Sequence, residues 1–114
     1  MSSFPKRGEV WLVNWNPGRG SEQRGTRPAL VIQNDVGNQY AETTIVAAIT
    51  TTIKKYPVTV VIPQGKGGLK EVSMINLAQI LTLDKKRLLK RLGLLGEEKM
   101  AEVDEAIKVS LGIN

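Results

Sequence analysis

Residues 44–49 read Thr-Ile-Val-Ala-Ala-Ile, a short apolar run of β-branched and small side chains that ends at three consecutive threonines. Residues 58–62 repeat the pattern as Val-Thr-Val-Val-Ile, and Pro57 and Pro63 delimit this second run. β-branched side chains favour extended backbone, and proline interrupts the hydrogen-bond ladder of a sheet. Both stretches therefore predict β-strands.

Similar runs lie on either side of these two. They cover residues 9–15, 29–32, 72–75 and 77–83. Glycine, proline, asparagine or aspartate stands beside each of them, as is typical of strand ends. Short strands at such close spacing predict a small barrel or sandwich. Residues 84–87 fit one capped helical turn, and residues 88–95 fit either a strand or a helix.

The pattern changes from Glu97 onward. Apolar side chains now recur at steps of three and four, at Met100, Val103, Ile107 and Leu111. That spacing places them on one face of a helix. Gly96 can serve as the N-cap, and Gly112 supplies a C-terminal stop. We expect an amphipathic helix at this end of a mostly β chain.

The composition limits both the fold and the chemistry. At 114 residues, with 41% hydrophobic and 24% charged residues, the chain is sized for one globular domain over residues 1–114. It has no cysteine and no histidine, which excludes disulfides, thiolate nucleophiles and the commonest general base. The carboxylates show no metal-ligand spacing, so we expect no metal and no cofactor.

No apolar stretch approaches the ~20 residues of a membrane span, and the start does not read as a signal peptide. A cytoplasmic protein is expected, with no membrane partner.

Positive charge is concentrated in the middle of the chain. Residues 54–91 carry nine Lys and Arg against two Asp and Glu, whereas residues 92–114 carry two against five. Such a basic segment indicates a surface that binds a polyanion. A solvated surface without a partner has a similar composition, so charge alone leaves both interpretations open.

The segment 16–26 and the residues after it hold the candidates for chemistry. This segment contains three glycines and two arginines, and glycine lets backbone approach a ligand while arginine grips phosphate. An exposed loop without a binding role has the same composition. Arg27 opens the next expected strand, where it is placed to face a cleft or to form a salt bridge at the rim. Thr50 ends the third strand.

These residues, in this order, resemble the MazF/PemK (Kid) family of toxin endoribonucleases. The resemblance runs from about Lys6 to Leu111. The matching pieces are Arg-Gly-Glu-Val-Trp (7–11), Asn-Pro (16–17), Gly-Ser-Glu-Gln (20–23), Arg-Pro-Ala-Leu-Val-Ile (27–32), Asn-Asp (34–35), Val-Ala-Ala-Ile-Thr (46–50), Gln-Ile (79–80), Leu-Asp-Lys (83–85) and Arg-Leu (87–88).

The resemblance implies an SH3-like small β-barrel with a C-terminal helix, working as a homodimer. It implies a type II toxin that acts as an mRNA interferase and arrests growth. Such an enzyme cleaves single-stranded RNA at short sequences without a metal, leaving 2′,3′-cyclic phosphate and 5′-hydroxyl ends. It also implies a cognate antitoxin whose acidic, disordered tail lies across the RNA site.

The matching motifs indicate which residues of this chain correspond to the family's site residues. Its catalytic arginine falls on Arg27 and its catalytic threonine or serine on Thr50. Residues implied to contact RNA are Gly20, Ser21, Glu22, Gln23, Arg24, Thr51, Ser73 and Gln79. Because a guanidinium group is a poor base near neutral pH, we assign Arg27 mainly to charge stabilisation, with Thr50 donating a hydrogen bond to a phosphoryl oxygen or orienting the attacking hydroxyl.

Two alternatives stand beside this interpretation. A gyrase-inhibiting toxin family shares the same barrel but binds a protein and has no enzymatic activity. It relies on a C-terminal Trp-Gly-Ile, and the present chain ends Leu-Gly-Ile-Asn without the tryptophan. An RNA-binding module without chemistry is the other alternative, and the presence of both Arg27 and Thr50 argues against it.

Overall fold

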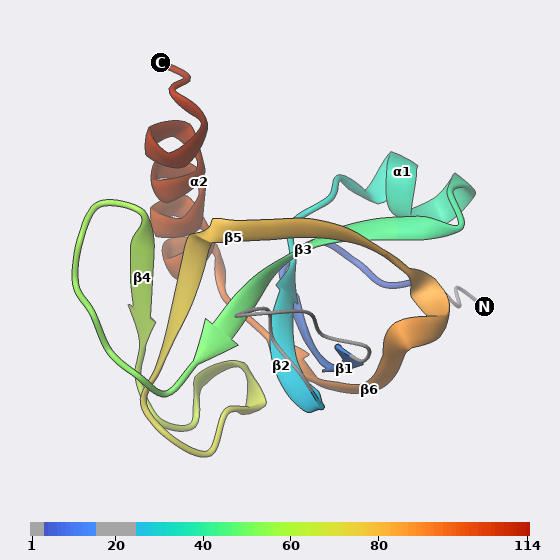
Figure 1. Ribbon diagram of the computed structural model, residues 1–114, viewed down its shortest axis with the longest axis horizontal. Coiled ribbons are helices and arrows are strands. Elements are labelled where there is room, and N and C mark those ends of the chain that lie inside the picture. Colours follow the sequence, from blue (N-terminus) through green and yellow to red (C-terminus); the bar gives the residue numbers. More distant parts are fainter. Residues whose placement is uncertain (1–3, 16–24) are drawn as a thin grey trace.

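The structure is a computed structural model that describes residues 4–15 and 25–114. Six antiparallel strands form one sheet in the order β4-β5-β3-β2-β1-β6, with two helices beside it (Figure 1). The strands are β1 (Glu9–Asn14), β2 (Thr26–Val31), β3 (Thr43–Thr50), β4 (Thr59–Ile62), β5 (Ser73–Asp84) and β6 (Leu88–Leu94). The helices are α1 (Asp35–Tyr40) and α2 (Glu97–Leu111).

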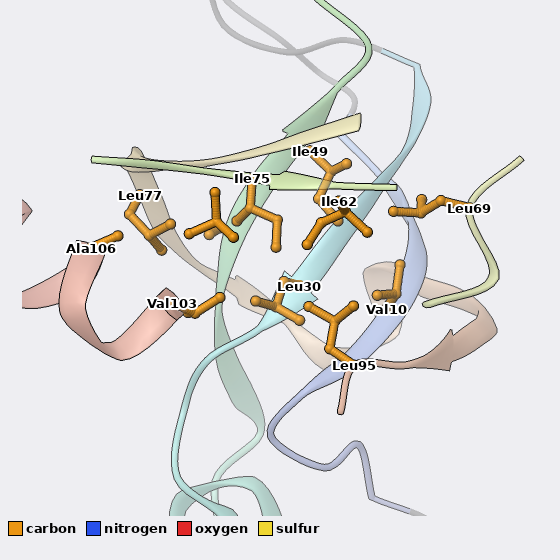
Figure 2. Packing of buried hydrophobic residues seen from close by; sticks show 12 residues of the cluster. Val10, Leu30, Ile49, Ile62, Leu69, Ile75, Leu77, Leu95, Val103 and Ala106 are labelled. Atoms are coloured by element: carbon orange, nitrogen blue, oxygen red, sulfur yellow. The ribbon is translucent and has the colours of Figure 1, made fainter. Parts of the chain in front are cut away.

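Both faces of the sheet bury apolar side chains. Along β2, Leu30 belongs to one cluster while its neighbours Ala29 and Val31 belong to another, as the alternation of side chains along a strand requires. The first cluster gathers side chains from the strands and from α2 into one layer (Figure 2). Val103 of α2 is fully buried in that layer, so the predicted apolar stripe of this helix packs against the sheet.

The predicted mostly β fold with a C-terminal helix is confirmed, and so is the span of α2. Gly96 precedes α2, and Gly112 ends it in the left-handed conformation at φ 70°. The ambiguous residues 88–95 form strand β6. The expected turn is a short 3-10 helix, η2 (Lys85–Arg87), whose Lys86 N–H donates to the Asp84 carboxylate at 2.8 Å.

One expectation about a single element was wrong, and one element was missed. The separate runs 72–75 and 77–83 are one long strand, because Asn76 pairs with both neighbouring strands and does not end β5. Helix α1 was not predicted. It has only six residues, its buried side chain is the polar Asn38, and Tyr40 is exposed, so the helix has no apolar stripe that a pattern could reveal.

The sheet curls but does not close into a full barrel. Within the described residues no ladder joins its two end strands, β4 and β6. Instead of β4, a 3-10 turn, η1 (Lys66–Gly68), lies against β6. A Cβ atom on Gly68 would fall 2.0 Å from the Leu92 carbonyl oxygen, and one on Gly93 would fall 2.5 Å from the Gly67 carbonyl carbon. Glycine at both positions therefore allows two backbones to touch where a sixth strand pair, between β4 and β6, would otherwise close the barrel.

In the part of the chain that the structure describes, no helix has the length and apolar character needed to cross a membrane.

Candidate active site

The register of β2 and β3 brings the two proposed catalytic residues to the same edge of the sheet. Ala29 pairs with Ala48, Arg27 lies two residues before Ala29, and Thr50 lies two residues after Ala48, so the antiparallel strands carry both residues toward the same end of the sheet. Side chains two apart on a strand share a face, so Arg27 lies on the face of Ala29 and Thr50 on the face of Ala48. Ala29 and Ala48 both belong to the second cluster. Arg27 and Thr50 thus lie toward the same end of the sheet and on the same face.

The backbone of Arg27 is held by a buried tryptophan. The indole Nε1–H of Trp15 donates to the Arg27 carbonyl oxygen at 3.2 Å, and the Trp15 N–H donates to the Gly25 carbonyl at 2.8 Å. Trp15 is only 6% exposed and packs in the second cluster with Val13, the residue opposite Arg27 in β1. The Arg27 backbone is therefore fixed from β1 while its side chain is exposed.

Thr50 is half-buried at the last position of β3. Its hydroxyl oxygen accepts a hydrogen bond from the Thr52 N–H at 3.2 Å. A hydroxyl group can accept and donate at the same time. This contact therefore orients Thr50 Oγ1 without using its proton, which the geometry leaves for donation to a ligand. On its other side Thr50 pairs with Met74 of β5.

A pocket of about 400 Å³ opens at this end of the sheet, and the residues that follow Arg27 and Thr50 in the chain line it. Two of the predicted RNA-contacting residues, Thr51 and Ser73, line it together with Pro28, the residue after Arg27. Ser73 is buried, and its hydroxyl donates to the Glu71 carbonyl at 2.9 Å, which fixes the start of β5. The structure thus brings Arg27, Thr50, Thr51 and Ser73 to one end of the sheet.

The other predicted contacts are not joined to this group. Gln79 is exposed on β5 in the stretch where the pairing with β3 shifts register between Ala47 and Ala48, and it does not line the pocket. Residues Gly20 to Arg24 lie outside the described residues, so their role stays a prediction.

Sequence reasoning missed the lysines at the pocket. Lys70 and Lys90 also line it, from the segment before β5 and from β6. They are twenty residues apart in the sequence. The high positive charge of residues 54–91 was the only signal that pointed to them.

Sequence reasoning also missed a polar cluster around Glu9. The Glu9 carboxylate accepts hydrogen bonds from the Lys6 N–H at 2.8 Å, from Trp11 Nε1 at 2.9 Å and from Arg91 Nε at 2.9 Å. Burial raises the pKa of Glu9, but these three hydrogen bonds and the charge of Arg91 outweigh it, so the pKa lies below its usual value. This carboxylate ties β1 to β6 and stays ionised at neutral pH.

Over residues 4–15 and 25–114, no three acidic side chains come together in a way that would hold a metal ion.

Comparison with known proteins identifies the family. The model of the PemK-like, MazF-like toxins of type II toxin–antitoxin systems matches residues 6–111. An endoribonuclease MazF from Staphylococcus epidermidis is 52% identical over 111 residues, which are 96% of this chain and 92% of that protein. The crystal structure of MazF from Deinococcus radiodurans superimposes with a TM-score of 0.83 at 26% identity, over 98% of this chain and all of the other. A mycobacterial endoribonuclease solved with its cognate antitoxin has the same fold, with a TM-score of 0.83 at 24% identity over 96% of this chain and 97% of the other.

A six-stranded antiparallel sheet with a C-terminal helix is the fold that this chain shares with the MazF toxins. The chain belongs to the PemK-like, MazF-like toxin family of type II toxin–antitoxin systems. It is an endoribonuclease of the MazF type, which decides against the gyrase-inhibiting alternative.

Proposed function

We propose that this toxin cleaves single-stranded RNA at short sequences by attack of the 2′-hydroxyl on the adjacent phosphate, with Arg27 and Thr50 as its catalytic residues. The observation that supports the proposal is the antiparallel β2–β3 pairing, since Arg27 lies two residues before Ala29 and Thr50 two residues after its partner Ala48. The reaction needs no protein nucleophile, because RNA supplies its own. The 2′-oxygen bonds to phosphorus while the P–O5′ bond breaks, and the products are a 2′,3′-cyclic phosphate and a 5′-hydroxyl.

Arg27 stabilises the charge that grows on the non-bridging phosphate oxygens. A guanidinium remains protonated at neutral pH and grips two oxygens at once, which suits this task better than proton abstraction. Its backbone is held by Trp15, so the side chain starts from a fixed anchor. Preorganised charge of this kind is commonly the largest contribution to catalysis.

Thr50 donates a hydrogen bond from its hydroxyl group to a phosphate oxygen, or it orients the attacking 2′-hydroxyl. Its oxygen is already held by the Thr52 N–H, which limits rotation of the side chain. The nucleophile, phosphorus and leaving oxygen have to be held in line, and a fixed donor beside Arg27 contributes to that alignment. DNA is not cut by this route because it lacks the 2′-hydroxyl.

The same proposal includes a homodimer as the active form and an antitoxin as the protein partner. The relative solved with its cognate antitoxin supports the second assignment. An acidic, disordered antitoxin segment would compete with RNA for the basic surface of residues 54–91, since both are polyanions.

Cleavage of a mixed-sequence RNA in the presence of excess EDTA tests the proposal. We expect discrete fragments whose ends are cyclic phosphate and 5′-hydroxyl, and we expect Arg27→Ala to lose about a thousandfold in rate. The variant Lys108→Ala, at an exposed lysine outside residues 54–91, serves as the control and should keep the activity of the unchanged protein. Full activity of Arg27→Ala would defeat the catalytic assignment, and activity that EDTA abolishes and magnesium restores would defeat the metal-independent mechanism.

A further inference from the structure

The segment 51–58 connects β3 to β4 and has to cross β5, because β3 and β4 lie on opposite sides of that strand (Figure 1). Met74 of β5 marks the place, since it pairs with Thr50 of β3 on one side and with Val61 of β4 on the other. The side chains of residues 51–57 are all exposed. A loop of this kind depends on hydrogen bonds of its backbone for a fixed shape.

Two side chains fix the backbone of Lys54 inside this segment. The Lys54 N–H donates to Met74 Sδ at 3.2 Å, and the Lys54 carbonyl oxygen accepts from the Thr59 hydroxyl at 3.0 Å. Met74 is only 3% exposed and is paired on both sides, so its sulfur is a rigid anchor. A thioether is a weak acceptor, but here burial keeps water from competing for the N–H group.

This anchor is connected to the hydroxyl group of Thr50. The Thr52 N–H donates to Thr50 Oγ1 at 3.2 Å, and Thr52 lies between the end of β3 and Lys54. The place of Thr52 therefore follows from two fixed points, and it sets the direction of the Thr50 hydroxyl. A displacement of about 1 Å in a catalytic group can cost on the order of a hundredfold in rate.

We propose that Met74 is a positioning residue for the chemical step: its sulfur fixes Lys54, and through Lys54 and Thr52 it orients the hydroxyl of Thr50. The inference rests on the proposed function, because it takes Thr50 to be catalytic. A buried methionine that served for packing alone would need only its shape. The contact with the Lys54 N–H needs the lone pairs of the sulfur as well.

Replacement of the sulfur by a methylene group tests the proposal. Norleucine has the shape of methionine without an acceptor, whereas selenomethionine keeps one. The chain has three methionines, at positions 1, 74 and 100, so in the Met100→Leu protein position 74 is the one internal site that the supplied amino acid changes. Steady-state cleavage of RNA is compared between this protein made with norleucine and made with selenomethionine. The matched control is Met74→Leu/Met100→Leu made with each amino acid, where only position 1 differs.

We expect norleucine to lower kcat by about tenfold and to leave KM within about twofold of the selenomethionine protein, because the substrate still binds while the hydroxyl is less well oriented. The two control preparations should have equal rates. Equal kcat of the norleucine and selenomethionine proteins would overturn the proposal. A change confined to KM, or a lower Tm with unchanged kcat, would show a role in packing only and would count against it equally.

The same exchange in a Thr50→Val background shows whether Met74 acts through Thr50. If it does, norleucine causes no further loss of kcat once the hydroxyl is gone. A tenfold loss that persists in this background would contradict the proposal and leave the catalytic role of Thr50 intact. Full activity of Thr50→Val with methionine at position 74 would instead defeat the proposed function, and this inference with it.

Discussion

The contact between η1 and β6 makes a sharp prediction about three glycines. Gly65 and Gly68 both have positive φ, at 87° and 76°, so alanine at either position carries the strain of left-handed backbone. Around Gly65, however, no atom lies within 4 Å of the added Cβ, whereas at Gly68 the Leu92 carbonyl oxygen lies 2.0 Å away. The two substitutions thus differ mainly in steric overlap.

The magnitudes follow from that difference. Left-handed backbone costs a non-glycine residue about 1–2 kcal/mol, which we expect for Gly65→Ala. Gly68→Ala adds displacement of β6 from η1 and should cost at least about 4 kcal/mol, within the range of severe substitutions. Gly93→Ala isolates the overlap, since its Cβ meets the Gly67 carbonyl carbon at 2.5 Å without positive φ, and should cost about 3 kcal/mol.

Urea and thermal unfolding, both at one fixed protein concentration, measure these differences, because association would otherwise change the apparent stability. For a domain of this size, 1 kcal/mol corresponds to roughly 4 °C in Tm. We expect Tm to fall by about 4–8 °C for Gly65→Ala and by more than about 15 °C for Gly68→Ala. Equal losses for the two variants would refute the close approach of η1 to β6.

Two further predictions concern Thr50 and Glu9. Thr50→Val keeps the branched shape of the side chain but removes the hydroxyl, so kcat should fall about a hundredfold. Thr50→Ser keeps the hydroxyl, so its kcat should stay within about tenfold of the unchanged protein. Equal rates for the two variants in a single-turnover RNA assay would show that the hydroxyl takes no part in the mechanism. Glu9→Gln should lower the free energy of unfolding at pH 7, since the carboxylate accepts three hydrogen bonds. The pKa of Glu9 is depressed in the folded protein, so this stabilisation is present above the unfolded value near 4.5 and is lost as pH falls through the lower folded value. Urea titrations at pH 7 and pH 3 should therefore show a smaller gap between Glu9→Gln and the unchanged protein at pH 3, and a constant gap would contradict the assignment.

Local patterns predicted most of the elements because each signal lies within a few residues. β-branched runs between turn residues gave the strands, and the three- and four-residue spacing from Met100 gave α2. Residues 88–95 remained ambiguous because exposed and half-buried side chains do not alternate regularly along β6, so the strand shows no period of two. Helix α1 escaped because its single fully buried residue is polar: Asn38 is held by hydrogen bonds to Gln33 and Thr44 and makes no apolar contact that a pattern would show.

By itself the sequence determined the strands, the helix, the absence of thiol and imidazole chemistry and, through the resemblance, the choice of Arg27 and Thr50. Only the tertiary structure decided what lies beside them. Lys70 and Lys90 meet at one pocket because the segment after η1 folds against β6, and a contact between segments twenty residues apart has no local signature. The open sheet was decided in the same way. A sheet closes into a barrel only if its two end strands can pair with each other. Here the backbone contact between η1 and β6 at Gly68 and Gly93 stands where β4 would have to pair with β6.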